Sequence, residues 1–299
     1  MHRAPRLLLV FVLGTGVATV HPAMHLMASS ANGGQAPQKA TVKPVSATTP
    51  DIPFPDYEPQ AEQQLLDLAN QARSKAGAPP LALDSGLSEA ARIHAQAMLE
   101  AQKLSHQFDG EASLPQRLAA TTMLQLDQEG ENVALDYDAE HGHEHLMNSP
   151  PHRANLLNPA YNVIGLGVVR SGDRLFIVQD FGHALPTYSV DAVKARVADA
   201  VNQLRRRAGQ PGLLRHDLLN ADTAACSMAE ADKLGTAAVR NLAGQSTMLT
   251  YTSLHPETLP NGTSHAISSH NLHTFSVGGC YGRTETYPTG VYWIVVSLK

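Results

Sequence analysis

Three polar side chains in the first half of the chain can do chemistry together, namely His106, Glu131 and His152. Two neutral imidazoles and a carboxylate can hold Zn²⁺ and leave one position open for water. The same groups can also perform acid–base catalysis, because histidine titrates near neutral pH. The residue types therefore allow a zinc site with His106 and His152 as ligands, a hydrolase that uses all three residues, or a polar cleft that binds without catalysis.

His152 is expected in the first turn of a short helix over residues 150–157. Ser149 is of a type favoured as an N-cap, and Pro150 suits the first helical position. A strong helix start is therefore predicted to orient the His152 side chain.

The other two residues are expected beside a helix end and a turn. Apolar residues at helical spacing predict a helix over residues 87–103, which Asp84 or Ser85 can cap, and His106 follows its end. Glu131 lies in a Gly-Glu-Asn stretch that we interpret as a turn. Such positions suit a small polar cleft.

The surrounding pattern predicts an α+β domain. Helical spacing indicates further helices over residues 62–76 and 138–147. Alternating apolar residues over 164–168, a Ser-Gly-Asp turn and an apolar run over 175–181 indicate a β-hairpin. Helices followed by a hairpin are typical of a layered α+β domain.

The second half of the chain repeats part of the first. Seven of the twelve residues from 70 to 81 recur without a gap at a shift of 132 residues. A helix and a pair of apolar strands then follow in the same order as in the first half. The copy has no counterparts of His106, Glu131 and His152, so a site is expected in the first half alone.

Several short motifs occur in a fixed order in the first half. They are NxxR at 70–73, GxPPL at 77–81, LSH at 104–106, GENV at 130–133, SPPHRANLL at 149–157, IGLG at 164–167 and QDFG at 179–182. By these motifs, residues from about 61 to 184 resemble the CAP superfamily of cysteine-rich secretory, antigen 5 and pathogenesis-related proteins. The resemblance is closest to its bacterial SCP-like extracellular branch.

The resemblance implies an α-β-α sandwich CAP-type domain followed by a degenerate CAP-like second domain. The cleft residues of the family correspond here to His106, Glu131 and His152. Many members have a second glutamate in the helix before the last histidine, whereas this chain has Ser149 or a neighbour there, and Glu144 is out of frame. Export and binding follow from the resemblance more securely than any reaction does, and lipid or sterol binding is known among members.

The run His-Gly-His-Glu-His over residues 141–145 has a metal-like composition. Adjacent histidines on a short helix point in different directions, and this run is therefore not expected to bind a metal. The HExxH motif is absent, and no serine or cysteine lies in a nucleophile motif.

The N-terminus has the pattern of a signal peptide over residues 1–31, with a basic start, an apolar run and small residues near a cleavage position. Cleavage would give a secreted, periplasmic or extracellular protein with no transmembrane span, and an uncleaved segment would serve as an N-terminal membrane anchor. A Pro/Ser/Thr-rich disordered linker is expected over 32–59, a CAP domain over 60–185 and the degenerate repeat over 186–299.

The only two cysteines, Cys226 and Cys280, both lie in the second half. In an exported protein such a pair is expected to form a disulfide, which would join a helix to a strand. Two buried free thiols are the alternative.

The leading hypothesis is an exported binding module whose polar cleft takes a divalent cation such as Zn²⁺, a lipid, a peptide or a cell-wall component. The alternatives are a metal-dependent or acid–base hydrolase that uses His106, Glu131 and His152, and a structural surface adaptor. We favour binding over catalysis. The net charge of −5 gives no reason to expect nucleic acid as a partner.

Overall fold

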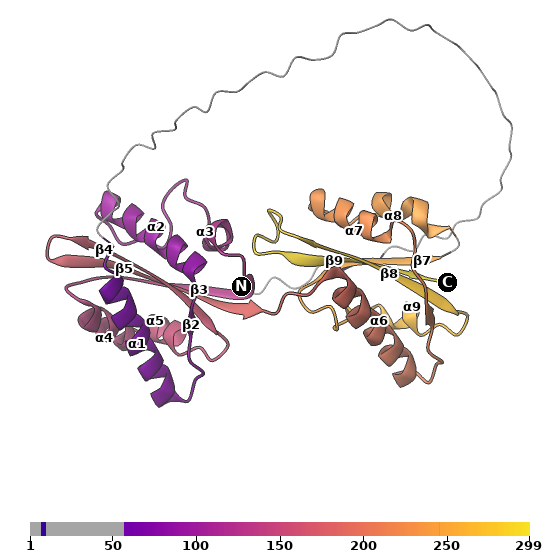
Figure 1. Ribbon diagram of the computed structural model, residues 1–299, viewed down its shortest axis with the longest axis horizontal. Helices are drawn as coiled ribbons and strands as arrows, with labels where there is room; N and C mark the ends of the chain where they lie inside the picture. The colour runs from indigo at the N-terminus through magenta and orange to yellow at the C-terminus, as the bar shows by residue number, and fades with distance from the viewer. Residues whose placement is uncertain (1–6, 10–56, 245) are drawn as a thin grey trace, which may run out of the picture. The chain divides into compact units, whose positions relative to one another are not determined.

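The computed structural model describes residues 7–9, 57–244 and 246–299, which all belong to one compact unit. Two β-sheets organise this unit, and each sheet has helices on both of its faces (Figure 1). The mixture of helices and strands confirms the α+β fold class.

The first half of the described chain runs from α1 to β5. Its elements are α1 (Pro59–Ala76), β2 (Ala82–Leu83), α2 (Ser85–Ala101), α3 (Leu114–Thr121), β3 (Gln125–Asp136), α4 (Ala139–Asn148), α5 (Pro150–Leu156), β4 (Val163–Ser171) and β5 (Arg174–Leu185). The predicted helices and hairpin correspond to α1, α2, α4, α5, β4 and β5, with small differences at their ends. The prediction of a turn at Glu131 is wrong, because this residue lies inside β3, which pairs with β5 along its length.

The first sheet has the strand order β2-β4-β5-β3, which makes β3 an edge strand. Helices α1, α4 and α5 lie on one face, and α2 and α3 lie on the other (Figure 1). Successive side chains of a strand point to opposite faces. On β4, Leu166 and Val168 therefore pack in the core that includes α1, α4 and α5, whereas Val169 packs in the core that includes α2.

Two glycines let α2 lie directly on β4. A Cβ atom at Gly165 would lie 2.1 Å from the carbonyl carbon of Leu87, and one at Gly167 would lie 2.2 Å from that of Ala91. Any side chain at either position would push the helix away from the sheet. The IGLG motif is thus explained by close packing rather than by chemistry.

The second half builds a similar set of layers. Its elements are α6 (Val190–Arg207), β6 (Leu214–Arg215), α7 (Ala221–Glu230), α8 (Thr236–Ala243), β7 (Thr247–Ser253), α9 (Ser264–Ile267), β8 (Thr274–Gly282) and β9 (Val291–Leu298). Strands β6-β8-β9-β7 have the same order and directions as β2-β4-β5-β3, and β1 (Leu7–Leu9) pairs antiparallel with the outer side of β7.

A buried arginine ties the first half together. The Arg73 side chain is fully buried and donates hydrogen bonds only to backbone carbonyls. Its Nε donates to Pro79 O at 2.7 Å, its Nη1 to Leu156 O at 2.8 Å and Asn158 O at 2.9 Å, and its Nη2 to Tyr161 O at 2.9 Å. One guanidinium therefore joins α1 to the segment after it and to the α5–β4 connection.

The second half repeats this contact at Arg205, the residue that matches Arg73 at the shift of 132. Its Nε donates to Pro211 O at 2.7 Å, and its Nη1 donates to Ile267 O at 2.6 Å and Ser269 O at 2.8 Å. The duplication thus extends from sequence to topology and to side-chain hydrogen bonds.

An asparagine is repeated in the same way. Asn70 donates to Leu81 O at 3.1 Å and accepts from Leu81 N at 2.8 Å. Asn202 pairs with both backbone groups of Leu213, at 3.4 Å and 2.8 Å. The division into domains at residues 185 and 186 stays a prediction.

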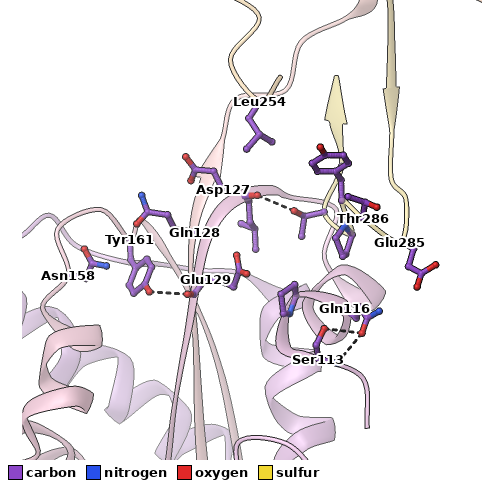
Figure 2. A pocket seen from close by; sticks show the side chains of 16 residues that line it. Ser113, Gln116, Asp127, Gln128, Glu129, Asn158, Tyr161, Leu254, Glu285 and Thr286 are labelled. Atoms are coloured by element: carbon purple, nitrogen blue, oxygen red, sulfur yellow. Dashed lines mark hydrogen bonds between the residues drawn. The ribbon is translucent and has the colours of Figure 1, made fainter. Parts of the chain in front are cut away.

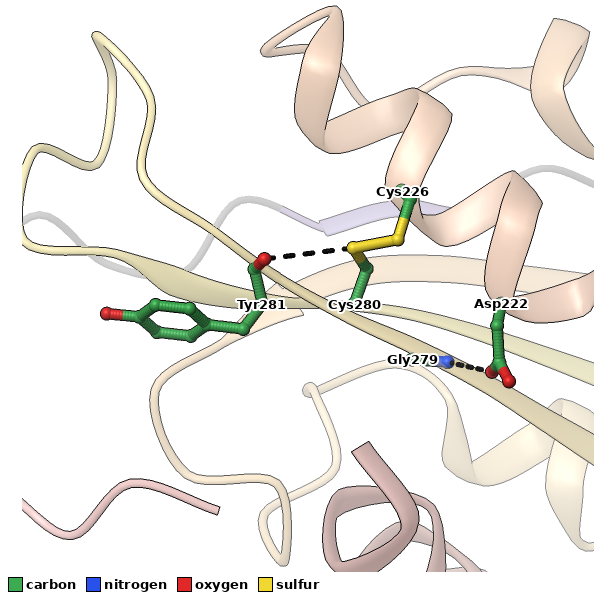
Figure 3. Close-up of a disulfide and its surroundings, with 5 residues drawn as sticks. All are labelled: Asp222, Cys226, Gly279, Cys280 and Tyr281. Atoms are coloured by element: carbon green, nitrogen blue, oxygen red, sulfur yellow. Dashed lines mark hydrogen bonds between the residues drawn. A yellow bond between two sulfur atoms is a disulfide. The ribbon is translucent and has the colours of Figure 1, made fainter. Parts of the chain in front are cut away.

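A disulfide joins Cys226 on α7 to Cys280 on β8 (Figure 3). One turn before Cys226, Asp222 accepts a hydrogen bond from Gly279 N at 2.9 Å. The covalent bond and this hydrogen bond hold α7 against the second sheet.

The predicted signal peptide and linker, residues 1–59, lie almost wholly outside the described residues. The structure describes only residues 7–9 and 57–59 of them. Among the residues that the structure describes, no helix combines the length and the apolar character needed to cross a membrane.

Replacing Arg73 with methionine is expected to lower the free energy of unfolding by at least about 3 kcal/mol, because several buried carbonyls lose their donor. Urea unfolding followed by circular dichroism measures the change. The exposed Arg153, replaced in the same way, is the control and should change the free energy by less than about 0.5 kcal/mol. Equal effects of the two substitutions would contradict a stabilising role for the Arg73 hydrogen bonds, which we call the Arg73 clamp.

Replacing both Cys226 and Cys280 with serine is expected to destabilise the second half by about 4 kcal/mol. The disulfide closes a segment with a sequence separation of 54 residues, and loop-closure entropy of the unfolded chain sets this scale. Thermal unfolding of the wild type with and without reductant gives an independent measure. A midpoint that does not fall in either experiment would show that the bond adds no stability.

Candidate functional site

The structure brings the three predicted site residues together at the edge of the first sheet. His106 lies in the connection between α2 and α3, Glu131 on β3 and His152 in the first turn of α5. The Nδ1 atom of His106 is 2.9 Å from Glu131 Oε1. The ring centroids of His106 and His152 are 6.4 Å apart. These side chains form a polar cluster that we call the His106 cluster.

Arg117 of α3 holds the carboxylate at the centre of this cluster. Its Nη2 donates to Glu131 Oε2 in a buried ion pair, and its Nη1 donates to His106 O at 3.1 Å. With His106 on the other oxygen, both oxygens of Glu131 have partners. Sequence reasoning missed Arg117, because α3 itself was not predicted.

A buried histidine of α2 supports the loop that carries His106. His94 is fully buried, with Nδ1 at 2.7 Å from Glu111 Oε1 and Nε2 at 2.8 Å from Ser105 O. Its Nε2 also lies 3.8 Å from Glu131 Oε2. This contact set fixes the loop on both sides of His106. The position of His94 on the buried side of the predicted helix over 87–103 was the sequence signal that could have identified this residue.

Asp180 of β5 lies directly across the strand pair from Glu131. It is fully buried, and among the described residues neither carboxylate oxygen has a hydrogen-bond donor. Burial first, and then the charge of Glu131, raise the pKa of Asp180 well above its ordinary value. The protonated, uncharged form of Asp180 is therefore favoured in its buried place beside Glu131.

Asparagine side chains that bond to backbone carbonyls hold the His152 segment in place. Ser149 is the N-cap residue and proline follows at the helix start, as predicted, but the Ser149 side chain makes no capping hydrogen bond. Instead Asn132 donates to His152 O at 3.1 Å, and Asn155 donates to Glu131 O at 3.1 Å. Partial burial and the neighbouring His106 lower the pKa of His152, which favours its neutral form.

The cluster does not fit a zinc site with three protein ligands. Glu131 has no free oxygen, and a guanidinium beside it opposes a second cation. Within the described ranges, no group of three or more His, Cys, Asp and Glu side chains is placed to hold a metal ion. A metal at this cluster would have His106 and His152 as its protein ligands and water at the other positions.

The second sheet lacks the acid pair at the corresponding place. In the first sheet one row across the strands consists of Gly165, Asp180 and Glu131. The row in the same register of the second sheet consists of Ser276, Ser297 and Met248. The second half therefore has the scaffold without this acid pair, and the sequence predicted the absence of a Glu131 counterpart.

A pocket of about 670 Å³ lies beside the N-terminal end of β3 (Figure 2). Tyr161 donates to Glu129 O at 3.1 Å at one side of it, and Thr289 donates to Leu126 O at 3.1 Å at another. Most of its lining side chains carry hydroxyl, amide or carboxylate groups or aromatic rings. The lining residues are Ser113, Pro115, Gln116, Leu126, Asp127, Gln128, Glu129, Asn158, Tyr161, Leu254, Glu285, Thr286, Tyr287, Pro288, Thr289 and Gly290.

Replacing Asp180 with asparagine is expected to change how stability depends on pH. A carboxyl with a raised pKa in the folded state binds a proton that the unfolded chain has already released above about pH 4. The wild type should therefore lose stability as pH rises from about 4, by up to about 1.4 kcal/mol per pH unit, and the variant should lose less. Urea unfolding between about pH 4 and pH 8 measures both slopes, and equal slopes would show that Asp180 is ionised throughout.

Comparison with known proteins gives a family for the first half. Residues 66–181 match the model of the CAP family, described as the cysteine-rich secretory protein family. The chain is 34% identical over 141 residues to the uncharacterized membrane protein YlbC of Bacillus subtilis (strain 168), covering 47% of this chain and 39% of that protein. It is 35% identical over 112 residues to the uncharacterized protein YkwD of the same organism, covering 37% of this chain and 43% of that protein.

The chain thus spans about two fifths of the length of these relatives. A solved extracellular protein containing a SCP domain from Bacillus anthracis str. Ames is 31% identical, with a TM-score of 0.38, over 42% of this chain and 41% of that chain. The part of the chain that contains residues 66–181 is therefore a CAP-superfamily domain similar to those of bacterial proteins.

Proposed function

We propose that this protein is an exported binding module that holds a polar ligand at the His106 cluster and in the adjoining pocket. The observation that carries the proposal is the engagement of both Glu131 oxygens, by Arg117 and by His106. The Glu131 carboxylate therefore orients the His106 imidazole. The exposed part of His106 and the neutral His152 ring are then the groups that meet a ligand.

The same geometry disfavours a hydrolase. A general base must be able to take a proton from water or substrate, and its pKa should lie near the working pH. Both Glu131 oxygens are already engaged, by Arg117 and by His106, so neither is free to take a proton from water or substrate. Asp180 lies behind it in a buried position, away from any substrate.

The pocket indicates which class of ligand fits. Alpha-helix α3 contributes Ser113 and Gln116 to the lining and Arg117 to the His106 cluster, while β3 contributes Glu129 to the lining and Glu131 to the cluster. Hydroxyl, amide and carboxylate groups suit a ligand rich in hydrogen-bonding groups, such as a peptide or a cell-wall glycan. They suit the acyl chain of a lipid poorly, because buried polar groups then lose their partners.

Export is supported by the disulfide between Cys226 and Cys280, since such bonds form and persist in oxidising compartments. The expected signal peptide over residues 1–31 agrees with this proposal. A divalent cation such as Zn²⁺ would take His106 and His152 as its protein ligands, as a supplement to ligand binding.

Replacing both His106 and His152 with alanine is expected to weaken binding to purified insoluble cell-wall polymer at least about tenfold, because both imidazoles that meet the ligand are lost. A tenfold change corresponds to about 1.4 kcal/mol. Co-sedimentation over a range of polymer concentrations gives the affinity. The exposed His270, replaced by alanine, is the matched control. Equal binding by the wild type and the double variant would contradict the proposal.

A further inference from the structure

Two histidines of α4 share one side of that helix, away from the His106 cluster. His141 and His145 are four residues apart, and residues at this spacing are neighbours on a helix surface. Their side chains are 58% and 66% exposed. His143 lies between them in sequence and turns elsewhere, with its Nδ1 buried and without a partner among the described residues.

Each of the two exposed rings is oriented by its own carboxylate. His141 Nδ1 lies 2.9 Å from both oxygens of Asp138, and His145 Nδ1 lies 2.5 Å from Asp136 Oδ2. Because Nδ1 is used in both rings, Nε2 is the nitrogen left to meet a ligand. The carboxylates are themselves fixed, since Asp138 caps α4 through His141 N and Asp136 is buried at the end of β3.

This arrangement is the one that metal-binding histidines need around them. A ligating imidazole usually donates its other ring nitrogen to a carboxylate, which sets the tautomer and increases the basicity of the ligating nitrogen. Here two adjacent imidazoles have such a partner. Two histidines at this spacing on one helix face can bind the same metal ion.

We propose that His141 and His145 form a binding site for a divalent transition-metal ion, with Nε2 of each ring as ligand and water at the remaining positions. Copper(II) is the tightest-binding candidate among the common divalent ions, because imidazole suits it and it stands highest in the affinity order. The site has two protein ligands, and it is separate from the His106 cluster in its residues and in the helix that carries them.

Titration of the full chain with Cu²⁺ tests the proposal, at about pH 8 where imidazoles are neutral. The background carries alanine at both His106 and His152, so that metal binding at the first cluster does not contribute. Calorimetry gives the affinity and the number of ions, and electron paramagnetic resonance counts the nitrogen ligands. Replacing both His141 and His145 with alanine should remove one bound ion per chain.

Further variants separate a metal site from a general effect of surface histidines. H141A and H145A alone should each weaken binding at least about tenfold. Asp138→Asn keeps an N-cap residue and should still weaken binding about tenfold through the lost carboxylate. His143→Ala on the same helix is the matched control and should leave the affinity within about twofold. If the double variant binds as many ions as its background with the same affinity, the proposal is overturned.

Discussion

The fold depends on a buried cation that has no carboxylate partner. Arg73 gives its guanidinium hydrogen bonds to four backbone carbonyls, contributed by the segment after α1 and by the α5–β4 connection. Moving a charge out of water is costly, and the hydrogen bonds to carbonyl dipoles offset that cost. Helices α1 and α5, which lie on the same face of the sheet, are consequently tied together, and α5 is the helix that carries His152.

The scaffold around this clamp could be read from the sequence to a large extent. Apolar spacing located α1, α2, α4 and the β4–β5 hairpin, and the Ser-Pro start located α5. The repeat from Asn70 to Leu81 pointed to residues that the structure uses twice. Strand β3 could not be read, because an edge strand with glycine, glutamate and asparagine side chains has no clear alternation of apolar and polar residues. That one error misplaced Glu131 at a turn.

Three members of the candidate site were predictable, and the residues that support them were not. His106, Glu131 and His152 stood out because their types suggest chemistry. Arg117 and Asp180 act through three-dimensional contacts between α3, β3 and β5, and nothing local in the sequence marks a carboxyl as lacking a donor. These buried contacts hold Glu131 in place, because the Arg117 guanidinium occupies one of its oxygens while His106 occupies the other.

The paired rows across the two sheets have a consequence for how the two halves could diverge. The hydrogen bonds of Arg205 and the row of Ser276, Ser297 and Met248 show that the second half has this architecture without the acid pair. The architecture and the polar cluster therefore have different requirements. The architecture needs a few residues that contact backbone, and the cluster needs residues that contact one another. The second half thus provides, within the same polypeptide, a similar fold without the acid pair. The contribution of the acid pair to the first half can be measured by comparison with it.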